Sequence, residues 1–174
     1  MSILTKALIL IAALGLAACN NPDRNGDAAN GDGSPMNGTG INSSALGDPN
    51  DPNSIAYFNQ TIGDRVLFAV DTSTLTPEGR AVLQGQAQWL LSHPGYAAII
   101  EGHADEQGTR EYNLALGARR ASAAQDFLIS QGVPAGLLRT VSYGKERPLA
   151  VCSDEACYSQ NRRAVTVLQA GAGA

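Results

Sequence analysis

The stretch from residue 20 to residue 54 sets the first limit on how this chain can fold. It is built almost entirely from Asn, Gly, Asp, Pro and Ser, and its only large aliphatic or thioether side chains are Met36, Ile41 and Leu46. So few apolar groups cannot bury enough surface to offset the entropy lost when a backbone is ordered. We therefore expect residues 20–54 to be a disordered tether, about 30–35 Å from end to end, and a single domain over residues 55–174.

The segment before the tether predicts export and a lipid anchor. Residues 1–18 contain one basic residue, Lys6, followed by an apolar run from Ala7 to Ala18, which is typical of a secretory signal peptide. As a helix this run would reach only about 18 Å, less than the roughly 30 Å hydrocarbon core of a bilayer. The tetrapeptide Leu16–Cys19 resembles the lipobox of bacterial lipoproteins, in which the cysteine receives a diacylglycerol and the chain is cut before it. We expect removal of residues 1–18 and a lipidated Cys19 at the head of the tether; a plain signal peptide is the alternative.

Charge and cysteine content narrow the range of partners. The chain after the tether has 10 basic and 11 acidic residues, so it lacks the electrostatic footprint of a nucleic-acid-binding protein. Cys152 and Cys157 remain as a pair once Cys19 carries lipid, and an exported compartment favours a disulfide between them. Two free thiols or half of a metal site are the alternatives. Because neither His93 nor His103 has ligand-like spacing to this pair, we expect no metal.

Beyond the tether, the apolar spacing switches between the periods of strands and helices. Strands are predicted over residues 65–70, 96–102, 138–143 and 164–168, and helices over residues 77–92 and 110–131. The run Ala97–Ile100 is continuously apolar, as expected of a strand that is buried on both faces. The order strand, helix, strand, helix, strand, strand predicts a two-layer α/β sandwich.

Local signals mark the ends of both predicted helices. Thr76 is a good N-cap for the first helix, and Pro77 is a good first residue. Thr109 is the predicted N-cap of the second helix, which Gly132 should end. Apolar spacing gives the second helix an expected core stripe of Leu114, Ala118, Ala121 and Leu128.

Four other residues of the second helix region point to a binding site. Thr109, Asn113, Leu116 and Arg120 follow at spacings of four, three and four. We expect them to share one helical face, distinct from the core stripe. The preceding loop places Asp105 near that face. Because a guanidinium matches a carboxylate and an aspartate accepts hydrogen bonds from an ammonium, the set predicts a pocket for a zwitterion. A simple ion pair between Asp105 and Arg120 is the alternative.

The sequence does not indicate catalysis. A glycosidase would need two carboxylates flanking the scissile bond, and a metal amidase three ligands with an open position. The sequence has neither a Ser/His/Asp order with a nucleophile elbow nor a spaced His/Cys cluster. His103, two residues before Asp105, is interpreted as a loop residue that lines the pocket rather than as a base or metal ligand. Arg162 and Arg163 are expected to hold the C-terminal loop through ion pairs, with binding to a partner's acids as the alternative. The acids considered for those ion pairs are Glu146, Asp154 and Glu155.

Five motifs between Val66 and Leu168 carry a family resemblance. They are Gly102–Glu106 with Gly108–Thr109, Glu111–Asn113, Leu116–Ala121, Val141–Glu146 and Tyr158–Val165. Each is weak alone, but together they resemble the peptidoglycan-associated lipoproteins, which belong to the outer-membrane protein A-like peptidoglycan-binding domains. The resemblance implies an α/β domain of order β-α-β-α-β-β with a mixed four-stranded sheet, no enzymatic activity and no cofactor.

The resemblance also implies a ligand, the free diaminopimelate end of an uncrosslinked peptidoglycan stem peptide. By position, Asp105 would bind the ammonium of this group and Arg120 its carboxylate. The remaining pocket residues implied by the resemblance are Asp71, His103, Thr109, Asn113 and Leu116.

Partners and location are implied in the same way. The family binds the periplasmic protein TolB and acts with the other Tol-Pal components, linking the outer membrane to the wall during cell division. Asn20 replaces the aspartate that retains enteric lipoproteins in the inner membrane, which favours the outer membrane and a domain facing the periplasm. Ala69 and Gln107 depart from the usual acid and arginine of the family, which affects the fine contacts. A lipoprotein that contacts only proteins is the alternative.

Overall fold

The computed structural model describes residues 46–171. The predicted signal peptide, Cys19 and the predicted tether up to residue 45 lie outside the described residues. Within the described part, no helix has both the length and the apolar character needed to cross a membrane.

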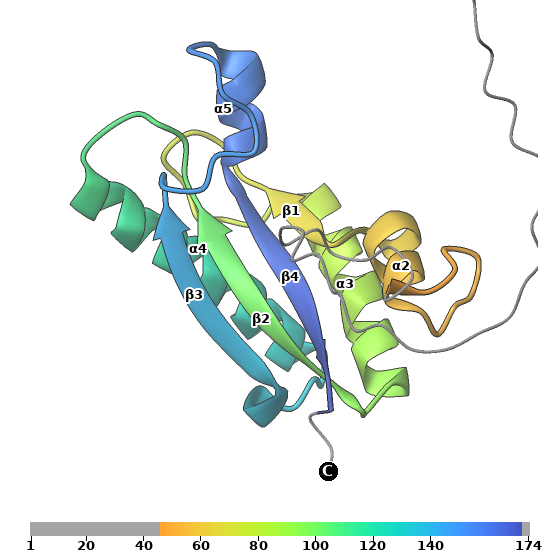
Figure 1. Cartoon of the computed structure of the whole chain (residues 1–174). Helices are drawn as coiled ribbons and strands as arrows, with labels where there is room; N and C mark the ends of the chain where they lie inside the picture. The colour runs from red at the N-terminus through yellow and green to blue at the C-terminus, as the bar shows by residue number, and fades with distance from the viewer. Residues whose placement is uncertain (1–45, 172–174) are drawn as a thin grey trace, which may run out of the picture. The chain divides into compact units, whose positions relative to one another are not determined.

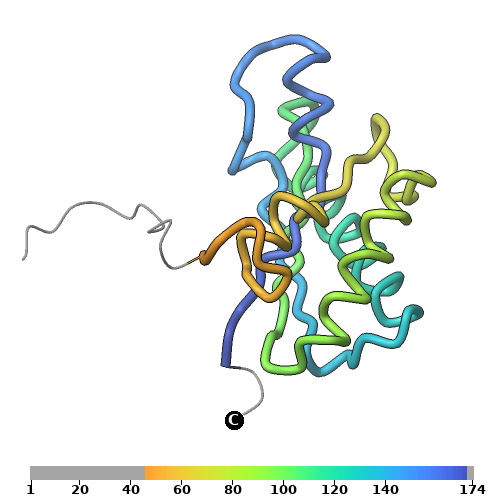
Figure 2. The backbone as a smooth tube through the Cα atoms, turned by 90° about the vertical axis from the view of Figure 1, so that its right-hand side faces the viewer, coloured from red at the N-terminus to blue at the C-terminus, as the bar shows by residue number. Residues whose placement is uncertain are grey.

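A four-stranded mixed sheet forms one layer of the domain (Figure 1). Its strands are β1 (Arg65–Leu67), β2 (Tyr96–His103), β3 (Leu138–Gly144) and β4 (Arg163–Ala170). They lie in the order β1-β4-β2-β3, and β4 is antiparallel to both of its neighbours while β2 and β3 are parallel. The helices α3 (Pro77–Ser92) and α4 (Arg110–Ser130) lie together on one side of the strands (Figure 2). The predicted α/β sandwich with a mixed sheet is confirmed.

The predicted helix caps are confirmed as well. The hydroxyl of Thr76 accepts a hydrogen bond from the amide of Gly79 at the start of α3. The hydroxyl of Thr109 accepts one from the amide of Tyr112 at the start of α4. Gly132 follows the end of α4 with φ of +99°, a conformation that glycine adopts without steric cost.

The core lies between the two helices and the sheet. It contains Leu83 and Leu90 of α3, Ala121 and Leu128 of α4, and Ile100 of β2. Burial alternates along β2, because helices cover only one of its faces. The prediction that Ala97–Ile100 would be buried on both faces is therefore wrong, since Ala97 and Ile99 are partly exposed.

The predicted core stripe of α4 is wrong at two positions. Leu114 is 50% exposed and Ala118 is also exposed. The buried residues of α4 are Asn113, Leu116, Gly117, Arg120, Ala121, Ala124 and Leu128. The face predicted for binding and the face that packs on the core are thus one continuous face.

Two glycines explain why the first half of α4 lies so close to the sheet. A Cβ atom on Gly102 of β2 would lie 1.8 Å from the carbonyl oxygen of Gly117, and one on Gly117 would lie 2.4 Å from the hydroxyl of Ser142. No side chain fits between the strand and the helix here. Polar residues of α4 on the same face are therefore enclosed and bond to neighbouring loops.

The strand predicted over residues 65–70 ends at Leu67. The amide of Phe68 still bonds to the carbonyl of Arg162, but the chain then turns, and Asp71 has φ of +54°. Short elements were not predicted because they lack a full apolar period. They are α2 (Ile55–Tyr57), the π-helix η1 (Phe58–Gly63), the 3-10 helix η2 (Ala135–Leu137) and α5 (Glu155–Asn161).

Residues 48–54, predicted as the end of the tether, are part of the folded domain. The indole nitrogen of Trp89 donates a hydrogen bond of 2.8 Å to the carbonyl of Pro52. Ser54 is buried, and its hydroxyl caps α2 by accepting from the amide of Tyr57. Backbone and side-chain hydrogen bonds order this segment despite its low apolar content, so the fold begins before residue 55.

Candidate functional site

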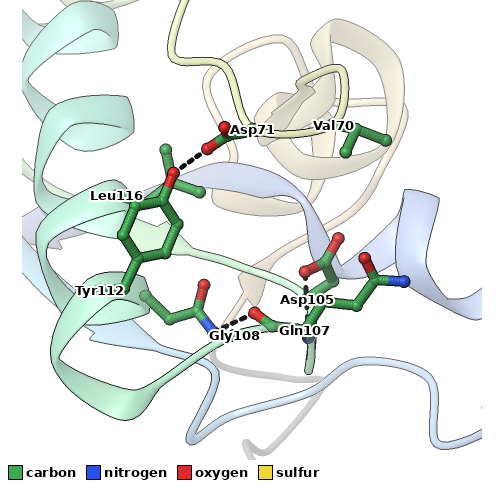
Figure 3. A pocket seen from close by; sticks show the side chains of 8 residues that line it. Val70, Asp71, Asp105, Gln107, Gly108, Tyr112 and Leu116 are labelled. Carbon is green, nitrogen blue, oxygen red and sulfur yellow. Dashed lines mark hydrogen bonds between the residues drawn. The ribbon is translucent and has the colours of Figure 1, made fainter.

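A pocket of about 230 Å³ lies where two loops meet the first turns of α4 (Figure 3). Since β1 and β2 are each antiparallel to β4, they run in the same direction, and the loops leaving their carboxyl ends converge. The lining residues are Val70, Asp71, Asp105, Gln107, Gly108, Tyr112, Asn113 and Leu116. The pocket is too small for a drug-sized ligand and suits the end of a side chain.

The lining contains two carboxylates and no basic side chain. Asp105 comes from the loop after β2 and is only 7% exposed. Asp71 comes from the loop after β1, and its carboxylate accepts a hydrogen bond from the hydroxyl of Tyr112 on α4. Figure 3 shows this bond joining the two sides of the pocket. The pocket therefore favours a cationic group.

The loop that carries Asp105 is held from two sides. The side-chain amide of Asn113 donates a hydrogen bond of 2.7 Å to the carbonyl of Gln107. The ammonium of Lys145 donates to the carbonyl of Gly108 at 2.7 Å, and Gly108 has φ of +87°. The amide of Gln107 in turn donates to Asp105 at 3.3 Å. These contacts fix the acid relative to α4 before any ligand binds.

Arg120 lies behind the pocket rather than in its lining. It is fully buried, and its guanidinium donates hydrogen bonds to the carbonyls of Thr72, His103 and Ala69 at 2.8, 2.9 and 3.2 Å. Burial lowers the pKa of Arg120 to about 10, while the charges of the pocket carboxylates Asp105 and Asp71 act in the opposite direction. Arg120 is therefore still a cation at neutral pH, and it lies close enough to both acids to feel their charges.

The ion partner of Asp105 is Arg162, not Arg120. The carboxylate of Asp105 lies 3.2 Å from Nη1 of Arg162, which is itself buried. Arg162 also binds Glu155 of α5 and donates to the carbonyl of Phe68. The expected ion pair of Arg162 with Glu155 is confirmed. For Arg163 the expectation is wrong, because its guanidinium donates to the backbone carbonyls of Asn161 and Arg147 instead of to an acid.

The ring of His103 does not line the pocket. It is 2% exposed, its nearest acid is Glu101 at 3.7 Å, and its ring packs beside that of Tyr143. Both ring nitrogens lack a hydrogen-bond partner. Burial, followed by the charges of Arg163 and Arg147, lowers the pKa of His103 to about 4. His103 is thus a buried neutral residue whose backbone carbonyl, rather than its ring, contacts Arg120.

The predicted site residues fall into two groups. Asp71, Asp105, Asn113 and Leu116 line the pocket together. Thr109 caps α4 and, like Arg120 and His103, is not part of the lining. The lining residues that the sequence did not single out for the pocket are Val70, Gln107, Gly108 and Tyr112. Tyr112 lies next to the predicted face of α4, so a wider face would have included it.

The short helix α5 supports the pocket from outside. Cys152 and Cys157 form the predicted disulfide at its start, with their Cα atoms 5.7 Å apart. Asp154 caps the helix by accepting from the amide of Cys157. In the described part of the chain, these three residues form the only cluster with metal-ligand side chains, and both sulfurs are used in the disulfide.

The buried side chain of Asn161 completes this support. Its amide oxygen accepts from the amides of Leu149 and Ala150, and its nitrogen donates to Glu106 in the loop that carries Asp105. The end of α5 is therefore joined to the loop at the pocket.

Comparison with known proteins places the chain in a family. Residues 67–162 match the OmpA family. The peptidoglycan-associated lipoprotein of Agrobacterium fabrum is 60% identical over 122 residues, which cover 70% of this chain and 68% of that protein. The peptidoglycan-associated lipoprotein of Rhizobium meliloti is 49% identical over 167 residues, which cover 95% of this chain and 88% of that protein.

Solved structures agree with this placement. The crystal structure of the peptidoglycan-associated lipoprotein from Burkholderia pseudomallei is 44% identical with a TM-score of 0.62, covering 70% of this chain and 98% of that one. The C-terminal domain of Helicobacter pylori MotB, at 20% identity and a TM-score of 0.58, shares the fold. This chain therefore belongs to the OmpA family and, within it, to the peptidoglycan-associated lipoproteins.

Proposed function

We propose that this protein is an outer-membrane lipoprotein that binds peptidoglycan non-covalently and catalyses no reaction. The observation that carries the proposal is the acidic pocket, in which two carboxylates and no basic side chain face a space of about 230 Å³. A free ammonium at the end of a wall peptide is a cation of suitable size. Membership of the peptidoglycan-associated lipoproteins supports the wall as its source.

The proposed ligand is the diaminopimelate end of an uncrosslinked stem peptide. Its ammonium binds Asp105, and Asp71 provides a second negative charge across the pocket. Its carboxylate binds Arg120, which has five N–H donors and uses three of them on backbone carbonyls. Because Arg120 lies behind the lining, this second contact requires a small movement of the loop after β1, which contains Ala69 and Thr72.

The expected affinity is modest. A charge-assisted hydrogen bond contributes about 1.5–3 kcal/mol, and the ligand makes only a few of them while it loses motional freedom. Many copies of the protein bound along one wall still hold the outer membrane firmly, although each single contact forms and breaks quickly. Such binding suits a connection that must move during growth.

The remaining parts of the proposal concern location and partners. A lipidated Cys19 anchors the chain in the outer membrane, and a tether starting at residue 20 carries the domain into the periplasm. TolB and the other Tol-Pal components are the proposed protein partners, and with them the protein supports constriction at cell division. Gln107 lines the pocket where the family usually has arginine, so it affects the contacts around the ligand.

Pelleting with insoluble peptidoglycan tests the wall-binding proposal. Residues 19–174 carrying Cys19→Ser, which cannot be lipidated, should sediment with the wall, and Asp105→Asn should leave the protein in the supernatant. Asp126→Asn removes an exposed acid of α4 outside the pocket and should sediment like the parent. Equal sedimentation of all three proteins would contradict the pocket proposal, and release of soluble muropeptides would show catalysis instead.

A separate experiment tests the Tol-Pal proposal. Purified TolB and the same unlipidated chain should elute together in size-exclusion chromatography. Separate elution at concentrations of tens of micromolar would remove TolB from the proposal without affecting wall binding.

A further inference from the structure

The Asp105 carboxylate in the pocket shares its arginine with a second acid. Nη1 of Arg162 lies 3.2 Å from Asp105 and 3.3 Å from Glu155, and Nη2 of Arg162 makes a further contact with Glu155. The Nε of Arg162 donates to the carbonyl of Phe68. All three nitrogens of the guanidinium are thus engaged, and two carboxylates compete for its charge.

The competition decides how negative the pocket is. Asp105 and Arg162 alone would form a neutral pair, leaving little attraction for a ligand ammonium. With Glu155 included, the three side chains carry one net negative charge, to which Asp71 and the buried Arg120 behind the pocket together add none. The side chains of Asp105 and Arg162 are only 10% and 6% exposed, so water screens their interaction less than it would at the surface.

Glu155 is well placed to compete with Asp105 for the charge of Arg162, although it is absent from the pocket lining. Its side chain is 66% exposed, and the hydrogen bond from Arg162 lowers its pKa, so it remains ionised at neutral pH. It lies inside the ring closed by the Cys152–Cys157 disulfide and directly follows Asp154, the N-cap of α5. This part of the backbone is therefore fixed by a covalent bond and a cap.

We infer that Glu155 is a specificity-determining residue: by binding Arg162 from outside, it leaves the charge of Asp105 available to a ligand ammonium. The inference rests on the proposed function, because it assumes that Asp105 binds an ammonium. It assigns a role in ligand selection to a residue that touches no ligand. The pairing of Arg162 with Glu155 would otherwise only stabilise the position of α5.

Calorimetric titration of the Cys19→Ser chain with free meso-diaminopimelate tests the inference. Glu155→Gln keeps the shape of the side chain and removes its charge, and it should weaken binding about five- to tenfold, a typical size for coupling between neighbouring sites. Glu155→Asp, which keeps the charge, should recover part of the loss. Glu111→Gln is the matched control, because Glu111 is also an acid in the first turn of a helix but does not contact Arg162.

Pimelate, which has the two carboxylates but no ammonium, separates charge from shape. If Glu155→Gln only distorts the pocket, it weakens any binding of pimelate and of diaminopimelate alike, and that result would overturn the inference. If Glu155 acts through charge, the variant loses affinity for diaminopimelate while pimelate binds at least as well as to the parent. Equal diaminopimelate affinity in parent and Glu155→Gln would also overturn the inference, while the proposed function would stand. A parent protein that binds neither the wall nor diaminopimelate would overturn the proposed function and the inference together.

Discussion

Replacing Arg120 with methionine should destabilise the domain by about 2–3 kcal/mol. The change removes the donor for three carbonyls, of which only the bond to His103 is fully buried. A buried carbonyl left without a donor costs about 1–3 kcal/mol, and the two partly buried carbonyls can recover some of their bonding from water. Removing a buried charge also returns its desolvation cost, which offsets part of the loss. Methionine retains most of the apolar volume of the arginine stem.

Urea unfolding followed by tryptophan fluorescence measures this change, because Trp89 is the only tryptophan of the chain and is buried. With an m-value of about 1.5 kcal/mol/M, the midpoint should fall by about 1.3–2 M. Arg119→Met is the control, since Arg119 directly precedes Arg120 on α4 and is exposed, and its midpoint should change by less than about 0.5 M. An equally small change for Arg120→Met would refute the view that Arg120 ties the loop after β1 to α4.

Gly102→Ala should lower stability by about 3 kcal/mol or more, because its new Cβ would meet the carbonyl of Gly117, whereas Gly95→Ala, with no atom within 4 Å of its Cβ, should change the urea midpoint little. Stability should also fall as the pH drops from 6.5 toward 4, by up to about 3 kcal/mol, because His103 with a pKa near 4 takes up a proton in the unfolded chain before the folded one. His103→Leu should flatten this decline in urea titrations at pH 7, 5.5 and 4.5, and an unchanged slope would show that other groups cause it. Reducing the Cys152–Cys157 disulfide should lower the free energy of unfolding by about 2 kcal/mol, because the unfolded chain regains the entropy that this short closed loop had removed. Thermal unfolding measures the change, and an unchanged melting temperature under reductant would contradict it.

Features set by neighbouring residues could be predicted from the sequence. The capping roles of Thr76 and Thr109 depend on an amide three residues ahead in each case, and the turn at Gly132 depends on its own φ. Such interactions are local, so the sequence contains all of their participants. The caps and the number of strands were therefore predicted correctly.

Features set by distant residues could not be predicted in the same way. Arg120 was assigned to a binding face, but it is buried because the carbonyls of Ala69 and Thr72, about fifty residues earlier, satisfy its guanidinium. The bond between Tyr112 and Asp71 joins residues 41 positions apart. Neither contact leaves a periodic pattern in the sequence. Both pocket acids were nevertheless predicted. Asp105 was found from its place in the loop before the second helix, whereas Asp71 came from the family resemblance.

The hydrogen bond between Trp89 and Pro52 joins residues 48–54 to α3, so it provides one path by which mechanical load enters the domain. In the proposed link, tension from the membrane arrives through residues 48–54 and passes to α3 and the core, while tension from the wall arrives at the pocket loops. The core is held by several kcal/mol of cooperative stability, but the wall contact consists of a few exchangeable bonds. Under excess force the ligand should therefore leave its pocket before the fold opens, and the intact domain can bind the wall again.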